Sequence, residues 1–176
     1  MLDFNTLQNT GRRTPDAHAV IKGSAAYPEL CGTVRLHQMA DGVLVSALIH
    51  GLPQGKGSCP VNVFGFHIHE GKACTGNDKD PFADSGGHFN PGNCPHPAHA
   101  GDMPPLFGNQ GTAYLSFFTD RFTVSQVIGR TVIIHSHPDD FTTQPSGDSG
   151  TKIACGLIER TGQQPRRGCA AVRPVC

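Results

Sequence analysis

The chain has little charge, no basic patch and no long hydrophobic run. Only 16% of its residues are charged, and its 14 Lys and Arg residues balance its 14 Asp and Glu residues. This balance gives no reason to expect nucleic acid or an acidic membrane as a partner. No run of about 18 apolar residues is present, so we expect no membrane span. With 176 residues, the chain has the usual size of one domain with its own core.

The start of the chain, MLDFNTLQNTGRRTPDA, lacks the basic, apolar and cleavage regions that follow one another in a secretory signal. Seven cysteines are many for a reducing compartment, but their number is odd. The sequence therefore leaves the compartment open. We expect an extracytoplasmic protein if a leader was removed, and a cytoplasmic one otherwise.

Long helical patterns are also absent, and the sequence instead favours short strands. The 22 Gly and 14 Pro residues favour turns and long loops. Apolar or alternating runs, separated by turn residues, occupy residues 17–23, 32–38, 43–51, 63–70, 111–118, 130–135 and 152–159. Asp41-Gly42, between the second and third runs, is a hairpin signal. Short strands at this spacing predict an antiparallel β-sandwich or barrel.

The strand pattern divides the chain into three parts. Residues 1–16 are polar, and we expect them to form a loose N-terminal arm. Residues 17–159 contain every predicted strand and form the predicted domain. Residues 160–176 contain four Arg and two Pro without periodicity, which predicts a C-terminal tail. Within the domain, residues 71–110 and 136–151 exceed the ~12–15 residues beyond which a loop is usually functional or disordered.

The stretch FGFHIHE places His67 and His69 in an otherwise apolar run. On a strand, side chains two residues apart point the same way, so these imidazoles would emerge about 7 Å apart on one face. Such a pair can converge on one metal ion. In isolation, the same pair is also compatible with hydrogen-bonded or surface histidines, so the other histidines of the chain must decide.

Five further metal-binding side chains lie along the sequence. They are His88, His96, His99 and Asp102 in the first long loop, and His135 at the end of the strand at 130–135. Together with His67 and His69 they exceed what one four-coordinate site can use. Two such sites need eight bonds from seven residues, which is possible if one deprotonated imidazole binds both metals.

His88 is the candidate for this shared ring. One predicted set of ligands is His88, His96, His99 and Asp102, which suits a tetrahedral Zn²⁺. The other is His67, His69, His135 and the second nitrogen of His88. An all-imidazole site suits copper, which, unlike zinc, cycles between two oxidation states.

The stretches GFHIHE, GGHFNP, HAGDMPPL, HSHPDD and GTKIACGLI occur in an order and with spacings that resemble the copper,zinc superoxide dismutases, particularly bacterial ones. The resemblance covers about residues 17–159. It implies an eight-stranded antiparallel Greek-key β-barrel or sandwich with two long functional loops. It also implies both ligand sets above, with copper and zinc as cofactors and superoxide as the substrate.

The resemblance further implies a reaction and a role for the bridge. Superoxide would reduce Cu(II) and leave as oxygen, and a second superoxide would reoxidise Cu(I) and leave as hydrogen peroxide. On reduction, His88 would release copper, take a proton and deliver it to the peroxide. His88 would thus be a general acid as well as a ligand.

Two further features follow from the resemblance. Asp139 matches the family aspartate that links a copper-binding histidine, here His69 or His67, to a zinc-binding histidine, His96. A turn aspartate is the alternative role, and Asp140 is a rival for the position. Cys74 and Cys155 match the family's disulfide, the alternative being two free buried cysteines.

The sequence departs from the family at Lys152. The family places an arginine there, which draws the anion toward copper and donates hydrogen bonds. Lysine keeps the charge but lacks the planar fork, so we expect Lys152 to support a reduced activity. Arg130 is a candidate to replace the missing guanidinium in space.

Several other residues lie outside both predicted ligand sets. We expect His137 to be exposed to solvent rather than to be a fifth ligand, because Pro138 follows it. Surface positions are expected for His18, His37 and His50. The remaining cysteines leave their pairing open: Cys94 could bond to Cys31 or Cys59, and Cys169 to Cys176.

Three functions are therefore compared. A superoxide dismutase is favoured because His67, His69 and His135, whose loss would indicate a protein without copper, are all present. A noncatalytic metal-binding protein of the same fold is the first alternative. A binuclear zinc hydrolase is less favoured, because such sites usually use bridging carboxylates or water. The family includes monomers and dimers, so a homodimer is one option.

Overall fold

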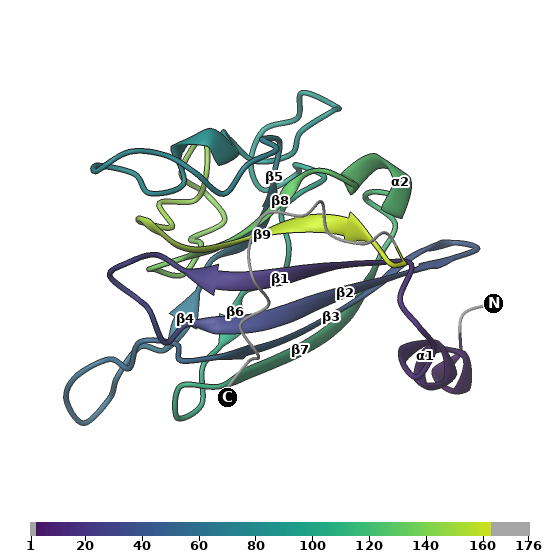
Figure 1. Cartoon of the computed structure of the whole chain (residues 1–176), viewed down its shortest axis with the longest axis horizontal. Helices are drawn as coiled ribbons and strands as arrows, with labels where there is room; N and C mark the ends of the chain where they lie inside the picture. Colours follow the sequence, from purple (N-terminus) through teal and green to yellow (C-terminus); the bar gives the residue numbers. More distant parts are fainter. Residues whose placement is uncertain (1–2, 163–176) are drawn as a thin grey trace.

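The computed structural model describes residues 3–162, which are mostly antiparallel β structure (Figure 1). The strands are β1 Ala17–Gly23, β2 Cys31–Met39, β3 Gly42–His50, β4 Val63–Phe64, β5 Phe66–His69, β6 Leu106–Phe107, β7 Ala113–Thr119, β8 Thr131–His135 and β9 Lys152–Arg160. The helical elements are α1 Phe4–Gly11, η1 Ala83–Ser85 and α2 Val124–Val127. The predicted all-β antiparallel fold is confirmed.

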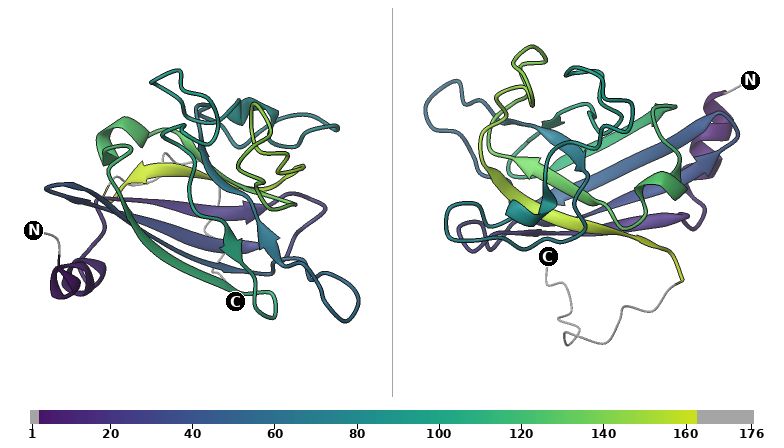
Figure 2. Two further views of the ribbon diagram at one scale, coloured as in Figure 1. Left: turned by 180° about the vertical axis from the view of Figure 1, so that it is seen from behind. Right: turned by 90° about the horizontal axis from the view of Figure 1, so that it is seen from above.

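Seven strands form one curled sheet in the order β5-β8-β9-β1-β2-β3-β7, and β4 pairs with β6 in a separate ribbon. The β1–β2 and β2–β3 connections are local hairpins, whereas β9 lies beside β1 and β7 follows β3 only after β4, β5 and β6. These long crossovers are typical of a Greek-key arrangement. Figures 1 and 2 show the sheet curling into a half-barrel with the long loops gathered at one end.

The strand expected over residues 63–70 is divided at Gly65. Before this residue β4 pairs with β6, and after it β5 pairs with β8. The Gly65 amide donates to the His137 carbonyl at 2.7 Å, and its carbonyl accepts from the His135 amide at 2.9 Å. A side chain at this position would press against Ser149 and His135. The change of partner at Gly65 lets one strand join the ribbon to the curled sheet.

Strands β5 and β8 are buried on both faces, unlike β1, which alternates between buried and more exposed residues. Ile68 and Ile134 face the main hydrophobic core. On the opposite face Ile133 belongs to a second cluster with Phe82 and Cys155, and His67 is fully buried. Because the long loops cover this outer face, polar side chains of β5 and β8 are enclosed without entering the core.

The N-terminal arm contains regular structure. Residues Phe4–Gly11 form α1, whose first turn is capped because the Asp3 side chain accepts a hydrogen bond from the Thr6 amide at 2.8 Å. The helix lies at the end of the sheet away from the long loops (Figure 2). The expectation that the whole arm is loose therefore does not hold for this helix.

The other end of the predicted domain lies close to the end of β9 at Arg160. The remaining tail, including Cys169 and Cys176, lies outside the described residues from position 163 onward. Within residues 3–162, no helix is long and apolar enough to cross a membrane. The domain boundaries and a homodimer stay predictions.

The predicted disulfide between Cys74 and Cys155 is confirmed, with an S–S distance of 2.01 Å. It fastens the first long loop to β9. Cys94 does not form the second bond considered above, because its exposed thiol is free and its Sγ lies 3.6 Å from the Gly92 carbonyl. The thiol of Cys59 is also free and exposed.

We predict that removal of this disulfide destabilises the fold. The bond closes a loop with a sequence separation of 81 residues, so the double substitution Cys74→Ser/Cys155→Ser should lower the free energy of unfolding by roughly 2–5 kcal/mol. Denaturant unfolding of the metal-free protein measures this change without the contribution of bound metal. Cys94→Ser is the matched control and should have little effect. Equal stability of the double variant and the wild type would show that the bond does not hold the loop.

Candidate metal centre

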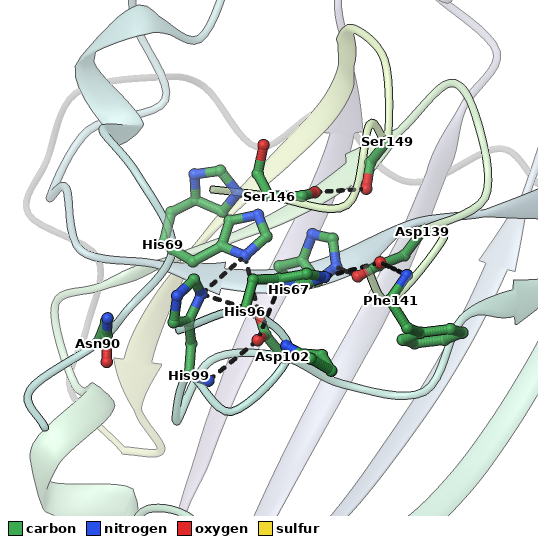
Figure 3. A network of polar contacts seen from close by, with 12 residues as sticks. His67, His69, Asn90, His96, His99, Asp102, Asp139, Phe141, Ser146 and Ser149 are labelled. Atoms are coloured by element: carbon green, nitrogen blue, oxygen red, sulfur yellow. Dashed lines mark hydrogen bonds and ion pairs between the residues drawn. The ribbon is translucent and has the colours of Figure 1, made fainter. Parts of the chain in front are cut away.

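Seven metal-binding side chains gather where β5 and β8 meet the first long loop. They form two sets, His67, His69, His88 and His135, and His88, His96, His99 and Asp102. Within each set one donor atom per residue lies within 4.8 Å of every other, and all seven residues are buried. Figure 3 shows the rings of His67, His69, His96 and His99 converging beside Asp102. The structure thus brings together all seven residues singled out in the sequence, with His88 in both sets.

The alternation of β5 directs its two histidines to one side. Phe66 and Ile68 face the core, so His67 and His69 emerge on the outer face beneath the loops. His67 lies opposite Ile133 of β8, and the β8 strand ends two residues later at His135. Two neighbouring strands therefore supply three imidazoles to one place.

Backbone hydrogen bonds place the first long loop against the free edge of β5. The Ile68 amide donates to the Gly101 carbonyl at 2.9 Å, and the Phe89 amide donates to the Ile68 carbonyl at 2.8 Å. These contacts set His88 opposite His69 and Asp102 opposite His67. Gly101 is needed for this approach, since a Cβ there would lie 2.2 Å from the Ile68 carbonyl oxygen.

The distances within the two sets are those of side chains that face a common point. In the first set, Nε2 of His69 and Nε2 of His135 lie 3.2 Å apart. In the second set, Nδ1 of His88 lies 2.7 Å from Asp102 Oδ1 and 3.4 Å from Nδ1 of His99. His88 therefore turns its Nδ1 toward the second set.

Within the seven metal-binding residues, three buried ring nitrogens have no hydrogen-bond partner among the described residues. They are Nδ1 of His67, Nε2 of His88 and Nδ1 of His96. Nδ1 of His96 lies 3.1 Å from Asp102 Oδ2 but is not aligned for a hydrogen bond. A buried polar atom without a partner is costly, and each of these atoms belongs to one of the two donor sets. The residues present therefore fit a metal ion in each set.

The Asp139 carboxylate connects the two sets, because it accepts a hydrogen bond from one histidine of each. Its Oδ2 accepts from Nε2 of His67 at 2.8 Å, and its Oδ1 accepts from Nε2 of His96 at 2.9 Å (Figure 3). With Nε2 of each ring donating to the carboxylate, Nδ1 is left as the metal-binding atom. Of the two histidines considered on the copper side, His67 makes this contact, whereas His69 lies against the Gly86 carbonyl. Asp140 is exposed and binds Thr142 and Thr143 instead.

Gln144 makes contacts with His96 that the sequence did not indicate. Its Oε1 accepts from the backbone amide of His96 at 3.0 Å, and its Nε2 donates to the His96 carbonyl at 2.7 Å. The second long loop thus holds His96 by its ring, through Asp139, and by its backbone. No local pattern marks Gln144, because its partner lies 48 residues away.

Burial keeps the histidines of β5 and β8 neutral. It lowers the pKa of His135 to about 3, with a further electrostatic contribution from the neighbouring rings of His67 and His88. Burial also lowers the pKa of His69 well below its usual value, and that of His67 despite its hydrogen bond to Asp139. Neutral imidazoles offer a lone pair, so these rings are prepared to bind metal at neutral pH.

The two carboxylates of the site are kept charged. Burial acts to raise the pKa of Asp139, but hydrogen bonds from His67, the Phe141 amide and His96 lower it to about 2. Burial likewise opposes ionisation of Asp102, yet its hydrogen bond with His88 and its electrostatic interactions with the neighbouring histidines lower its pKa overall. Negative charge is therefore available beside both donor sets.

A cavity of about 580 Å³ opens onto the first set. His69, His88 and His135 lie in its wall, and Lys152 lies there too. The Lys152 ammonium donates to Asp80 Oδ2 at 3.0 Å and to the Phe82 carbonyl at 3.1 Å. A small molecule can therefore reach the first set past a cation.

Arg130 does not take the place of the missing guanidinium. It is not among the residues that line this cavity. Its side chain donates to the Glu70 carbonyl, and its guanidinium carbon lies 4.8 Å from the centre of the Phe89 ring. His137 is exposed, as expected, and belongs to neither set. His37, expected at the surface, is instead buried at 2% exposure.

Comparison with known proteins agrees with this geometry. Residues 30–158 match the family model described as copper/zinc superoxide dismutase. The "Superoxide dismutase [Cu-Zn]" of Deinococcus radiodurans is 34% identical over 149 residues, which cover 74% of this chain and 78% of the relative. "Superoxide dismutase [Cu-Zn] 2" of Aquifex aeolicus is 34% identical over 146 residues, or 74% and 80% of the two chains.

A third relative gives a similar match. "Superoxide dismutase [Cu-Zn] A" of Xenopus laevis is 30% identical over 158 residues, which cover 81% of this chain and 95% of the relative. The residues matched by the family model include both donor sets, the disulfide and the whole curled sheet except β1 and the last two residues of β9. The chain belongs to the copper/zinc superoxide dismutase family.

Proposed function

We propose that this protein converts superoxide to oxygen and hydrogen peroxide at a copper and a zinc ion that share the imidazolate of His88. Family membership supports the activity and both metals. The observation that carries the shared ring is the environment of His88. Its Nδ1 contacts Asp102 and His99, while its Nε2 is buried without a hydrogen-bond partner.

The two donor sets differ in chemistry, which supports the assignment of the metals. The set His67, His69, His88 and His135 consists of imidazoles alone and would hold copper. The set with Asp102 combines three imidazoles with a carboxylate and would hold zinc. Copper, when bound, exchanges one electron with each superoxide.

His88 would also hold and release a proton. The reaction consumes two protons for each pair of superoxide ions. Nε2 of His88, on the side of the copper set, would deliver one of them, and water in the open cavity would supply the other. Its contacts with Asp102 and His99 would keep the ring oriented during the transfer.

Asp139 and Lys152 would support the reaction without binding metal. Asp139 fixes which nitrogens of His67 and His96 face the metals. Lys152 places a positive charge in the wall of the cavity and would attract the superoxide anion. Its ammonium has three N–H groups, two of which already donate to Asp80 and Phe82.

The shared ring is tested by the substitution His88→Gln. Loss of the proton donor should lower superoxide turnover by at least about 100-fold, the lower end of the usual contribution of general acid catalysis. Loss of the bridge should also change the Cu(II) electron paramagnetic resonance spectrum and lower the zinc content. Turnover, spectrum and metal content are measured on protein loaded with both metals.

His137→Gln is the matched control for this experiment. His137 is exposed and outside both donor sets, so its substitution should leave turnover and metal content unchanged. If His88→Gln bound both metals and kept full turnover, the shared ring would have no part in the reaction.

The role of Asp139 is tested by Asp139→Asn against Asp140→Asn. The asparagine side chain accepts a hydrogen bond through its oxygen but not through its nitrogen, so either His67 or His96 loses its partner. Zinc or copper affinity, measured by competition with a chelator, should fall about 10- to 100-fold for Asp139→Asn. Asp140→Asn should keep wild-type affinity, and equal affinities for the two variants would contradict the proposed role.

The departure at Lys152 is tested by Lys152→Arg. A guanidinium has five N–H groups, so it can keep the contacts with Asp80 and Phe82 and still donate to an anion. We expect superoxide turnover at low ionic strength to rise by roughly two- to fivefold, because the planar guanidinium can donate two parallel hydrogen bonds to an anion, whereas the ammonium is a single point of charge. An unchanged or lower rate would mean that the missing fork does not limit the reaction.

A further inference from the structure

The Lys152 ammonium forms an ion pair with a carboxylate in the wall of the cavity that leads to the first set, the proposed copper ligands. In the β8–β9 pairing Lys152 lies directly opposite His135. Its Nζ lies 3.0 Å from Asp80 Oδ2, and both residues line the cavity. Only 15% of the Lys152 side chain is exposed, compared with 37% of the Asp80 side chain. The cation that faces the substrate path therefore has a fixed partner of opposite charge.

Asp80 is itself held in place by its own loop. Its Oδ1 accepts from the Phe82 amide at 2.9 Å, and its carbonyl accepts from the Asn77 and Ala83 amides. Its amide donates to the Asn77 side chain at 3.1 Å. The Cys74–Cys155 disulfide fastens the same loop to β9, which carries Lys152. The carboxylate and the ammonium are thus presented by two segments that are covalently joined close to the pair.

The formal charges of the side chains that line the cavity sum to zero because Asp80 is one of them. Four charged side chains line it: Glu70, Lys79, Asp80 and Lys152. Two are acidic and two are basic, so their formal sum is zero. An ion pair attracts an approaching anion less strongly than a lone ammonium does, because the carboxylate repels the same anion from a neighbouring position. Removal of the Asp80 charge alone would leave this group with a net charge of +1.

We infer that Asp80 is a positioning residue that restrains the Lys152 ammonium beside the copper set and offsets its charge, thereby limiting the attraction of small anions. This inference rests on the proposed function, since it concerns how the substrate reaches the same site. It assigns a role to a residue that binds no metal. It also gives a physical reason, beyond the missing fork, for a reduced activity with Lys152.

The substitution Asp80→Asn tests this role. Asparagine has the same shape, and its amide oxygen can still accept from Lys152 or from the Phe82 amide, so the loop should keep its structure while the charge is lost. The copper- and zinc-loaded protein is titrated with azide, a small monovalent anion that ligates copper, and binding is followed by visible absorption. Superoxide turnover is measured on the same samples.

Ionic strength separates the effect of charge from a structural effect. We expect Asp80→Asn to bind azide roughly three- to tenfold more tightly at about 0.01 M salt, and the gain should shrink at about 0.15 M salt, where the Debye length falls from ~30 Å to ~8 Å. Superoxide kcat/KM should rise in parallel and become more dependent on salt than in the wild type.

Two further variants complete the experiment. Asp78→Asn removes an equal charge from the same loop, but Asp78 is exposed and does not line the cavity, so azide affinity should stay close to that of the wild type. In a Lys152→Gln background, Asp80→Asn should bring a smaller gain, because the cation that it releases is absent. A gain as large for Asp78→Asn as for Asp80→Asn would overturn the inference.

The two proposals can fail separately. Unchanged or weaker azide binding by Asp80→Asn would overturn the role of Asp80, even if the wild type turns over superoxide. Absence of superoxide turnover by the fully loaded wild type would overturn the proposed function, and the azide titration would still decide whether Asp80 limits anion access.

Discussion

The arrangement of the whole site depends on one imidazole that is buried between two sets of donors. His88 lies within reach of three other histidines on one side and of two histidines and Asp102 on the other. A residue in this position links the two sets, because any movement of its ring changes both. The curled sheet, the loop that pairs with the edge of β5 and the Asp139 carboxylate all hold the neighbours of this ring. Family membership implies copper and zinc as the metals, and in the proposed function His88 lies between them.

The fold encloses polar groups without placing them in the hydrophobic core. Strands β5 and β8 direct Ile68 and Ile134 into the core and their histidines to the opposite face. The long loops bury that face, which lowers the pKa of the histidines and leaves their lone pairs free for metal. The same loops leave one cavity open toward His69, His88 and His135. The long loops thus both enclose the histidines and leave a path to them, and the ion pair of Lys152 and Asp80 lies in the wall of that path.

The sequence by itself indicated the fold class, the candidate metal ligands and the disulfide partners. Alternating apolar runs indicated an antiparallel β fold, because the period of two is a local property of the chain. His67 and His69 could be read as ligands because their spacing on a strand already places them on one face. The other five candidate ligands were recognisable by residue type and by their concentration in one long loop and at one strand end. Cys74 and Cys155 were identified through family resemblance, and the structure joins them.

Only the tertiary structure decided which residues meet across long separations. It placed His67, and not His69, against Asp139 of the second long loop. It kept Arg130 out of the cavity, bound Gln144 to the backbone of His96 and paired Lys152 with Asp80. It also formed α1 in the arm expected to be loose and divided one expected strand at Gly65. Each of these contacts depends on how segments far apart in the chain are brought together, and no local periodicity encodes that.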